Sequence, residues 1–343
     1  MKRLLNTLYI TGTNRYLSLD GENVVVLEDQ KEIGRIPLHN LQGIVTFGYT
    51  GASPALMGAC AQRNIDLTFM SGNGRFLARV TGELKGNVTL RKQQYRVSED
   101  RTKSIRIARN FIFAKVYNAR WILERAARDY SLRVDAELLR EKSSFLYKSL
   151  QGIRICEDPS KLLGMEGEAA SVYFSAFDQL ILQQKEDFTF CGRNRRPPLD
   201  KVNAMLSFAY SLLAGICGSA LEGVGLDPYV GFYHTDRPGR ISLALDIMEE
   251  LRAVMADRFV LTLINKRIIK TGNFIQKENG AVALDESGRK LFLHAWQEKK
   301  QDIIKHPFLN EKIEWGMVPH AQAMLLARYL RGDLDEYPPF LWK

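Results

Sequence analysis

One acidic residue lies on a predicted apolar helix face in the segment 159–180. That face is predicted from apolar residues at helical spacing: Leu163, Ala170, Tyr173, Phe177 and Leu180. Glu166 falls on this face, whereas Glu168 falls off it. A carboxylate among apolar side chains is costly unless it is ion-paired, protonated or bound to a metal. Glu166 is therefore a candidate metal ligand, and a salt bridge to an arginine is the structural alternative.

A loop histidine and an acidic helix follow in the segment 231–252. His234 is bracketed by glycines and arginines, and the helix after it carries Asp246, Glu249 and Glu250. Asp246 and Glu249 are three residues apart and so share one helix face. An imidazole and two carboxylates can ligate a divalent cation, either magnesium or manganese. The alternatives are a hydrogen-bonded loop histidine and an acidic first helical turn that the helix dipole favours.

Arginines accompany both acidic segments. Arg193, Arg195 and Arg196 precede the stiff dipeptide Pro197-Pro198, where guanidinium groups could meet phosphate oxygens. A solvated loop between helices is the alternative interpretation. Three further arginines are candidate phosphate contacts by their proximity in the sequence alone: Arg237, Arg240 and Arg252.

The charge of the chain favours an anionic partner. The 343 residues are 45% hydrophobic and 25% charged, which excludes a disordered or collagen-like protein. Lys and Arg number 48 against 39 Asp and Glu, a net charge of +9. Residues 75–154 hold 19 basic and 8 acidic residues, a net +11, so the rest of the chain sums to −2. This basic belt indicates nucleic acid, with solvated basic helices as the alternative.

Neither a zinc site nor a membrane span is favoured. The four cysteines form no C-x-x-C pair, and we expect them to be buried thiols in a reducing cytoplasm: Cys60, Cys156, Cys191 and Cys217. Residues 202–221 carry no charge, and this uncharged run is long enough to span a bilayer. Their serines and glycines favour a helix that is buried all round in a soluble domain instead.

The elements that must position these residues change in type along the chain. Strands are predicted over 16–19, 24–27, 33–36, 43–47, 65–70 and 76–81, with turns at 20–23 and 71–74 and a helix over 54–63. Helices are predicted near 100–129, 134–152, 159–185, 200–221, 243–268, 287–304 and 318–331, with a short hairpin in 272–286. The fold class is therefore α+β: a small β-sheet domain over 1–95, then a larger all-α domain over 96–343.

Three segments, in this order, resemble one family. They read KLLGMEGEAASVYF, GRNRRPPLDKVNAMLSFAYSLL and GFYHTDRPGRISLALDIMEELR. The chain resembles the CRISPR-associated integrase subunit, the larger of the two near-universal spacer-acquisition proteins. The start, LNTLYITGTNRYLSLDGENVVV, and the ending, YPPFLWK, extend the resemblance to nearly the whole chain, and the ending and length are most like subtype I-C.

The resemblance implies a site and a reaction. The metal ligands would be Glu166, His234 and Glu249, where Glu249 replaces the aspartate of other members, and Asp246 would support them. With Mg2+ or Mn2+, such a protein joins the 3′-hydroxyl of a new spacer DNA to the CRISPR repeat by transesterification. Its expected partners are double-stranded DNA, a second copy bound through the β-domain, and a small ferredoxin-like protein. The rival hypotheses are a metal-dependent repair nuclease for branched DNA and a non-catalytic DNA-binding scaffold.

Overall fold

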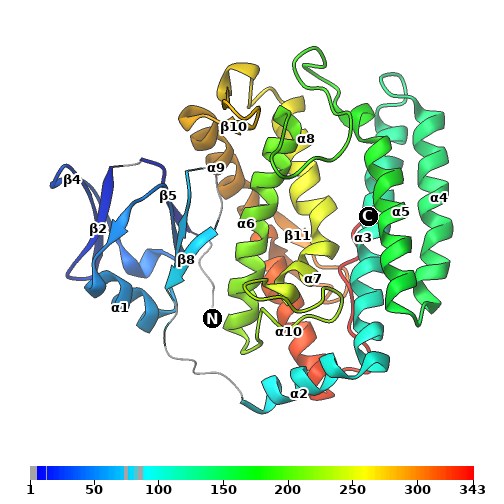
Figure 1. Cartoon of the computed structure of the whole chain (residues 1–343), viewed down its shortest axis with the longest axis horizontal. Helices are drawn as coiled ribbons and strands as arrows, with labels where there is room; N and C mark the ends of the chain where they lie inside the picture. The colour runs from blue at the N-terminus through cyan, green and yellow to red at the C-terminus, as the bar shows by residue number, and fades with distance from the viewer. Residues whose placement is uncertain (1–5, 13, 73–75, 81, 83–87) are drawn as a thin grey trace. The chain divides into compact units, whose positions relative to one another are not determined.

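The computed structural model describes residues 6–12, 14–72, 76–80, 82 and 88–343. They divide into two compact units. The first unit combines the described residues up to 82 with 284–302 and 314–317, and the second combines 88–283 with 303–313 and 318–343. The α+β class is confirmed, since the N-terminal part is mostly strands and the rest mostly helices (Figure 1). The division differs from the two contiguous segments expected, 1–95 and 96–343, because α9 (Glu286–Gln301) belongs to the strand-rich unit.

The first unit contains two four-stranded sheets. One has the order β1 (Thr7–Ile10), β5 (Gly43–Phe47), β7 (Asp66–Met70) and β8 (Phe76–Val80), in which only β8 is antiparallel to its neighbour. The other has the order β4 (Lys31–Pro37), β3 (Asn23–Glu28), β2 (Arg15–Asp20) and β6 (Gly51–Ala52). The predicted strands are present, whereas β1 and β6 were not predicted. The predicted turn at 71–74 lies partly outside the described residues.

Local sequence signals explain the hairpin and the helix of this unit. Asp20 pairs with Asn23, so β2 and β3 are joined by a two-residue turn, in which Gly21 takes the positive φ of +56°. Ser53 caps α1 (Pro54–Arg63), because its hydroxyl accepts a hydrogen bond from the backbone of Leu56 at 3.2 Å. The helix then buries Leu56 in the core that the strands line.

The second unit is built mainly from helices. They are α2 (Val88–Glu99), α3 (Arg101–Asp129), α4 (Ala136–Ile155), α5 (Pro159–Ser175), α6 (Lys201–Gly223), α7 (Ser242–Leu251), α8 (Arg258–Asn265) and α10 (Val318–Arg331). Short hairpins join β9 (Phe274–Gln276) to β10 (Val282–Leu284) and β11 (Ile303–Lys305) to β12 (Lys312–Glu314). Single 3-10 turns cover Phe177–Leu180 and Thr271–Asn273 in this unit, and Leu38–Asn40 and Trp315–Met317 in the first. The helices α3, α4 and α5 pack side by side (Figure 1).

Several predicted boundaries are wrong. The helix predicted over 159–185 ends at Ser175 and continues only as the 3-10 turn Phe177–Leu180. The helix predicted over 243–268 contains the π-helical turn Arg252–Asp257, which separates α7 from α8. Helix α2 was not predicted, because its largely polar sequence resembles a border between domains. Inserted π turns leave the apolar spacing nearly helical, so periodicity cannot reveal them.

The apolar helix α6 is a core helix within its unit. Asp200 caps it, because its carboxylate accepts a hydrogen bond from the backbone of Asn203 at 2.7 Å. By length and composition α6 could cross a membrane, but 61% of its most apolar window is buried inside the protein. Most of its residues are buried, but Ser207, Ser211 and Gly215 on one face are only half-buried, so the predicted burial is confirmed for most of the helix and not on all sides.

The cysteine prediction is correct at three positions and wrong at one. Cys60, Cys156 and Cys217 are buried free thiols. Cys191 is a free thiol too, but it is exposed. It lies in the irregular segment between the 3-10 turn ending at Leu180 and α6, where no helix face carries it into the core.

Candidate active site

Helix α5 places Glu166 at the edge of a buried face. Leu162, Ala169 and Tyr173 are at most 4% exposed, whereas Leu163 is 60% exposed, so the predicted stripe is wrong by one residue at its start. Glu166 still lies on the corrected stripe, because it stands four residues after Leu162 and three before Ala169. Its side chain is 17% exposed. This position leaves the carboxylate at the border between core and solvent.

The histidine loop is folded around Asp246 of α7. The carboxylate, which is completely buried, accepts backbone hydrogen bonds from Phe232 (2.7 Å), Tyr233 (3.0 Å) and His234 (2.9 Å). A Cβ atom at Gly231 would lie 2.9 Å from its Oδ2, so this close approach requires glycine. Asp246 stands in the second turn of α7, and the alternative of an acidic first turn is therefore wrong.

The same carboxylate orients the imidazole. Asp246 Oδ1 lies 2.7 Å from His234 Nδ1, and because the carboxylate only accepts, Nδ1 carries the proton in the neutral ring. The lone pair of Nε2 is then free to bind an electrophile. Nε2 lies 3.9 Å from Glu249 Oε1. Asp246 thus supports His234 in the way a hydrogen-bonded carboxylate supports a metal-binding histidine.

Glu249 is the most deeply buried of the three candidate ligands. It is 3% exposed, and its Oε1 accepts from Arg252 at 2.7 Å. Burial alone would raise the pKa of this carboxyl, but the charges of Arg252 and Lys115 lower it to about 2. Glu249 is therefore ionised over the whole physiological pH range.

Lys115 of α3 joins Glu166 to Glu249. Its Nζ lies 2.6 Å from Glu249 Oε2 and donates a hydrogen bond to Glu166 Oε1. In the sequence, Lys115 counted only as one of the basic residues of the belt over 75–154, and this role was missed. The spacing held the signal, because Lys115 stands three residues after Ile112 and four before Ala119, both buried. The expected salt bridge of Glu166 is thus present, but with a lysine.

Tyr233 completes this side of the site. Its hydroxyl donates to Glu166 Oε2 at 3.4 Å, and its ring meets the His234 ring edge-on at 5.1 Å. Burial, together with the charges of Glu166 and Glu249, raises the pKa of Tyr233. The phenol therefore remains a hydrogen-bond donor.

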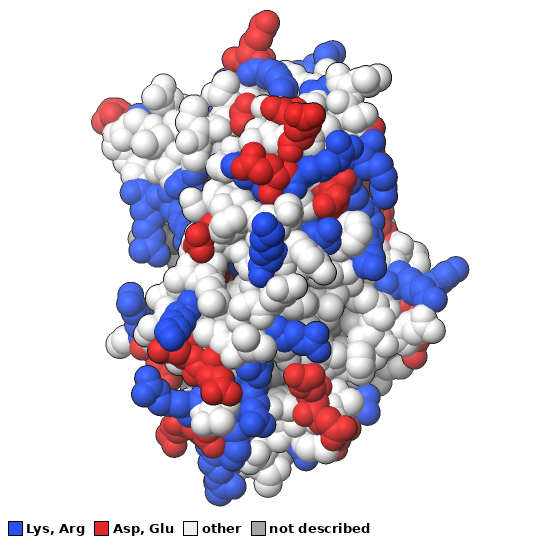
Figure 2. Space-filling view, turned by 90° about the vertical axis from the view of Figure 1, so that its right-hand side faces the viewer, with Lys and Arg blue, Asp and Glu red and all other residues white. Residues whose placement is uncertain are grey.

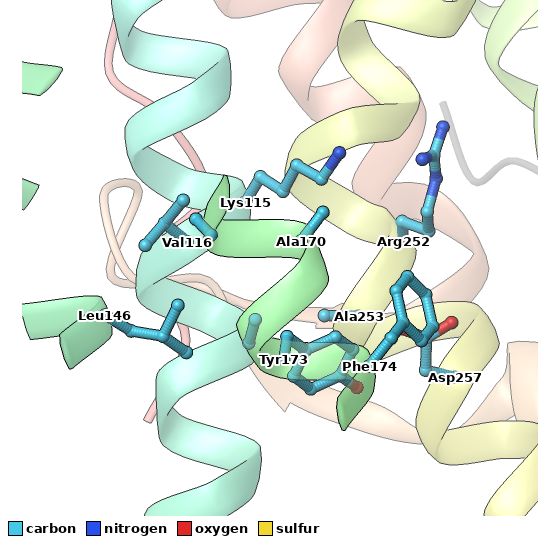
Figure 3. Close-up of a pocket in the computed structure, with 11 residues that line it drawn as sticks. Lys115, Val116, Leu146, Ala170, Tyr173, Phe174, Arg252, Ala253 and Asp257 are labelled. Carbon is cyan, nitrogen blue, oxygen red and sulfur yellow. The ribbon is translucent and has the colours of Figure 1, made fainter. Parts of the chain in front are cut away.

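A pocket lies between α3, α5 and the π-helical turn. In Figure 3, Lys115 and Arg252 extend toward one end of the pocket, and Tyr173 and Asp257 lie toward the other. Asp257 accepts from the Tyr210 hydroxyl at 2.6 Å, and the Arg252 guanidinium lies 4.9 Å from the Tyr210 ring centre. Burial raises the pKa of Asp257 to about 6, although Tyr210 and Arg252 oppose the shift. These polar contacts thus hold in place the π-helical turn that begins at Arg252.

The residues around Lys115 have the donor types that Mg2+ or Mn2+ takes, two carboxylates and an imidazole. Glu249 Oε2 is buried and receives no hydrogen bond of normal angle, although Lys115 Nζ is 2.6 Å away. As they stand, no three His, Cys, Asp or Glu side chains in the described part of the chain are arranged to hold a metal ion. A cation already bridges Glu166 and Glu249, so the donor set fits a divalent cation once Lys115 moves aside.

The predicted DNA-binding arginines fall into two groups. Arg193 donates to Asn203 Oδ1 at 2.6 Å, and Arg252 is paired with Glu249, so both guanidiniums have partners inside the protein. The others are exposed or half-exposed: Arg195, Arg196, Arg237 and Arg240. On the face that carries α4 and α5, Figure 2 shows Lys and Arg in several groups with acidic side chains between them. The basic belt therefore does not form one continuous stripe on that face.

Glu250 faces away from the site and holds the C-terminal tail. Its carboxylate accepts from the Tyr337 hydroxyl, from Gln322 at 3.1 Å and from the backbone of Phe340 at 2.8 Å. Asn118 of α3 bridges the same elements, donating to the backbone oxygens of Glu250 (2.7 Å) and Phe340 (2.8 Å). The tail thus ties α3 to α7, the two helices that supply Lys115 and Glu249.

Comparison with known proteins agrees with the sequence resemblance. The family model described as CRISPR associated protein Cas1 matches residues 8–298. The CRISPR-associated endonuclease Cas1 1 of Chlorobaculum tepidum is 48% identical over the full length of both chains. A casposase bound to integration product shares the fold at a TM-score of 0.84, with 23% identity over 98% of this chain and 94% of that one. A Cas6-RT-Cas1–Cas2 complex gives a TM-score of 0.81 and 23% identity over 98% of this chain and 36% of the other.

Proposed function

Because the chain belongs to the Cas1 family of CRISPR-associated proteins, we propose that it is a metal-dependent DNA endonuclease and integrase of CRISPR adaptation. The observation that carries this proposal is that Lys115 contacts both Glu166 and Glu249, while His234 Nε2 lies 3.9 Å from Glu249 Oε1, so that two helices and a loop bring the three side chains together. The relative from C. tepidum is named an endonuclease, and a neighbour in fold is a casposase bound to its integration product. The ending Tyr337–Lys343 favours subtype I-C.

Glu166, His234 and Glu249 would hold Mg2+ or Mn2+, which supplies a Lewis acid for the phosphodiester. The chain prepares this site in three ways. Asp246 keeps the proton on His234 Nδ1, Arg252 and Lys115 keep Glu249 ionised, and Tyr233 holds Glu166 by a hydrogen bond.

The reaction is a direct transesterification. The 3′-hydroxyl of the spacer DNA attacks a phosphodiester of the repeat, a new phosphodiester forms, and the 3′-oxygen of the repeat strand leaves. Arg195, Arg196, Arg237 and Arg240 would bind the backbone of double-stranded DNA, mainly through sequence-independent charge. The family resemblance adds two partners, a second copy of this chain and a small ferredoxin-like protein. The reaction would take place in the cytoplasm.

A plasmid-integration assay tests this function. The purified chain and its small partner are mixed with a repeat-bearing plasmid, labelled duplexes with free or blocked 3′ ends, and Mg2+, Mn2+ or EDTA. We expect joined products at the repeat border only with a free 3′-hydroxyl and a divalent cation. Cut strands without joining would instead indicate a hydrolytic nuclease for branched DNA, and DNA binding with neither product would indicate a scaffold.

Glu166→Ala is the decisive variant in this assay. Glu168→Ala is its matched control, because Glu168 lies two residues further along α5 and is exposed. We expect the first variant to lose joining and the second to keep it. Joining by a folded Glu166→Ala protein at the wild-type rate would show that the proposed metal site is wrong.

A further inference from the structure

We propose that Lys115 is a built-in counter-cation that competes with the divalent cation for Glu166 and Glu249, so that the metal binds tightly only when DNA is present. This inference rests on the proposed function, since it concerns the same site. It assigns Lys115 a positioning and regulatory role that the reaction itself does not require.

The first argument is the position of the ammonium. Lys115 Nζ contacts Glu249 Oε2 at 2.6 Å and also Glu166 Oε1, so it occupies the gap between the two carboxylates. Its side chain is only 12% exposed. Two cations cannot hold the same two oxygens, because their mutual repulsion is strong in a poorly solvated site. Binding of a divalent cation therefore requires that Lys115 release at least one carboxylate.

The second argument is the charge balance of the pocket. Lys115 and Arg252 lie at the opposite end of the pocket from Asp257 (Figure 3). Among the side chains that ion pairs link to Lys115, three negative charges come from Glu166, Glu249 and Asp246. Lys115 and Arg252 contribute two positive charges, which leaves a net −1. A divalent cation raises this sum to +1. One phosphodiester group then restores neutrality. The pocket as built therefore favours a metal ion and a phosphate together over a metal ion alone.

The third argument is where the displaced ammonium can go. Glu249 is already paired with Arg252, and Asp246 already accepts hydrogen bonds from three backbone N–H groups and His234. Neither carboxylate can therefore replace the ion pair that Lys115 gives up. A DNA phosphate does, because an ammonium donates readily to phosphate oxygens. Metal and DNA should then bind cooperatively, and each should raise the affinity for the other by the same factor.

Mn2+ binding tests the proposal without any measurement of activity. Free Mn2+ is followed by electron paramagnetic resonance during titration of the full-length chain, with and without duplex DNA, and the Mn2+ bound by DNA alone is subtracted. For the wild type we expect DNA to tighten Mn2+ binding roughly 10-fold or more. For Lys115→Met we expect binding to be roughly 10-fold tighter than the wild type without DNA, and nearly independent of DNA.

Controls separate this proposal from the proposed function. Lys148→Met makes the same change at an exposed position of α4 and should leave Mn2+ binding as in the wild type. If Glu166→Ala and Glu249→Ala bind Mn2+ like the wild type, the metal site of the proposed function is wrong. If those two variants lose Mn2+ but Lys115→Met binds it no better than the wild type without DNA, only the role of Lys115 is wrong.

Thermal unfolding gives a second readout. Without Lys115, the Glu166 and Glu249 carboxylates face each other with less compensation, so Lys115→Met should melt at a lower temperature in EDTA. Mn2+ should then raise its melting temperature more than that of the wild type. An equal Mn2+ effect on both proteins would contradict the proposal. Lys115→Gln, which keeps a hydrogen-bond donor, replaces the methionine variant if the latter does not fold.

Discussion

Asp246 Oδ1 lies 2.7 Å from His234 Nδ1, and the same carboxylate accepts hydrogen bonds from three backbone N–H groups of the histidine loop. One side chain therefore sets both the path of the loop and the tautomer of its imidazole. Because the carboxylate accepts a hydrogen bond from Nδ1–H, the lone pair of the neutral imidazole is on Nε2, which lies 3.9 Å from Glu249 Oε1. The acidic helix and the histidine loop are thus one structural unit.

Asp246→Asn tests this relationship. The amide nitrogen would face one of the backbone N–H groups from which the carboxylate now accepts a hydrogen bond. It could also donate a hydrogen bond to Nδ1, which would place the imidazole proton on Nε2. We expect Mn2+ affinity and strand joining to fall roughly 10- to 100-fold, and stability to fall by about 1–3 kcal/mol. Titration, the integration assay and urea unfolding measure the three effects. Asp236→Asn, in an exposed position of the same loop, should change none of them.

The three candidate ligands should separate catalysis from DNA binding. Glu166→Ala, His234→Ala and Glu249→Ala should each abolish joining, while the duplex affinity measured by fluorescence anisotropy stays close to that of the wild type. Their stabilities should differ, because Glu249→Ala leaves Arg252 and Lys115 without their buried partner, at a cost of about 3–5 kcal/mol. If all three variants lose DNA binding in parallel with joining, a structural role explains them better.

How far the sequence predicts this site depends on the kind of contact. Glu166 and His234 are recognisable from local patterns, since one is a carboxylate on an apolar stripe and the other precedes an acidic helix. Glu249 was one of three acidic candidates on that helix, and only the family resemblance selected it from Asp246 and Glu250. The true stripe begins at Leu162 instead of Leu163, because adjacent leucines satisfy the same periodicity. Lys115 was missed because its partners stand 51 and 134 positions away in the sequence. The spacing within α3 places Lys115 on the buried side of its helix, but it does not contain the identity of its partners, because which helices pack together is not set by the spacing within one of them.

The same difference between local patterns and contacts between distant residues holds for the fold. The Gly21 turn, the Ser53 cap and the Asp200 cap were predictable, because each depends on neighbouring residues. The π-helical turn at Arg252–Asp257 was not, since its polar groups are satisfied by Tyr210 on α6. The membership of α9 in the strand-rich unit was not predictable either, because a helix that follows many helices carries no local mark of a distant sheet.

Stability should fall as the pH rises through the range in which Glu250 titrates. Burial raises the pKa of this carboxyl from 4.5 to about 7, although Tyr337, Phe340 and Gln322 oppose the shift. Between these values the unfolded chain has lost the proton while the folded chain keeps it, so raising the pH favours unfolding by about 1.4 kcal/mol per pH unit. Urea unfolding between pH 5 and 6.5 should show a slope that Glu250→Gln reduces by about 1.4 kcal/mol per pH unit, and the part that remains is expected from Asp257, whose pKa burial raises to about 6. An equal slope in the variant would mean that Glu250 is ionised throughout this range.

The C-terminal tail should contribute strongly to stability through Asn118. This side chain is fully buried; it donates to Glu250 and Phe340 and accepts from the backbone of Trp342 at 2.9 Å. Asn118→Ala leaves buried backbone groups without partners, so we expect a loss of about 3 kcal/mol. Trp342→Ala removes a ring whose centre lies 4.4 Å from the guanidiniums of both Arg125 and Arg258, and we expect a loss of about 1–2 kcal/mol.

The two tail variants should not be additive. Once Asn118→Ala releases the backbone of Trp342, the ring loses its fixed place between the helices, so the double variant should cost less than the sum of the single changes. Urea unfolding of the four proteins measures this coupling, and Trp342→Phe, which keeps an aromatic ring, should recover part of the loss. Strict additivity would show that the ring and the backbone of the tail are held independently. In that case the tail could not transmit its binding energy to the packing of α3 against α7.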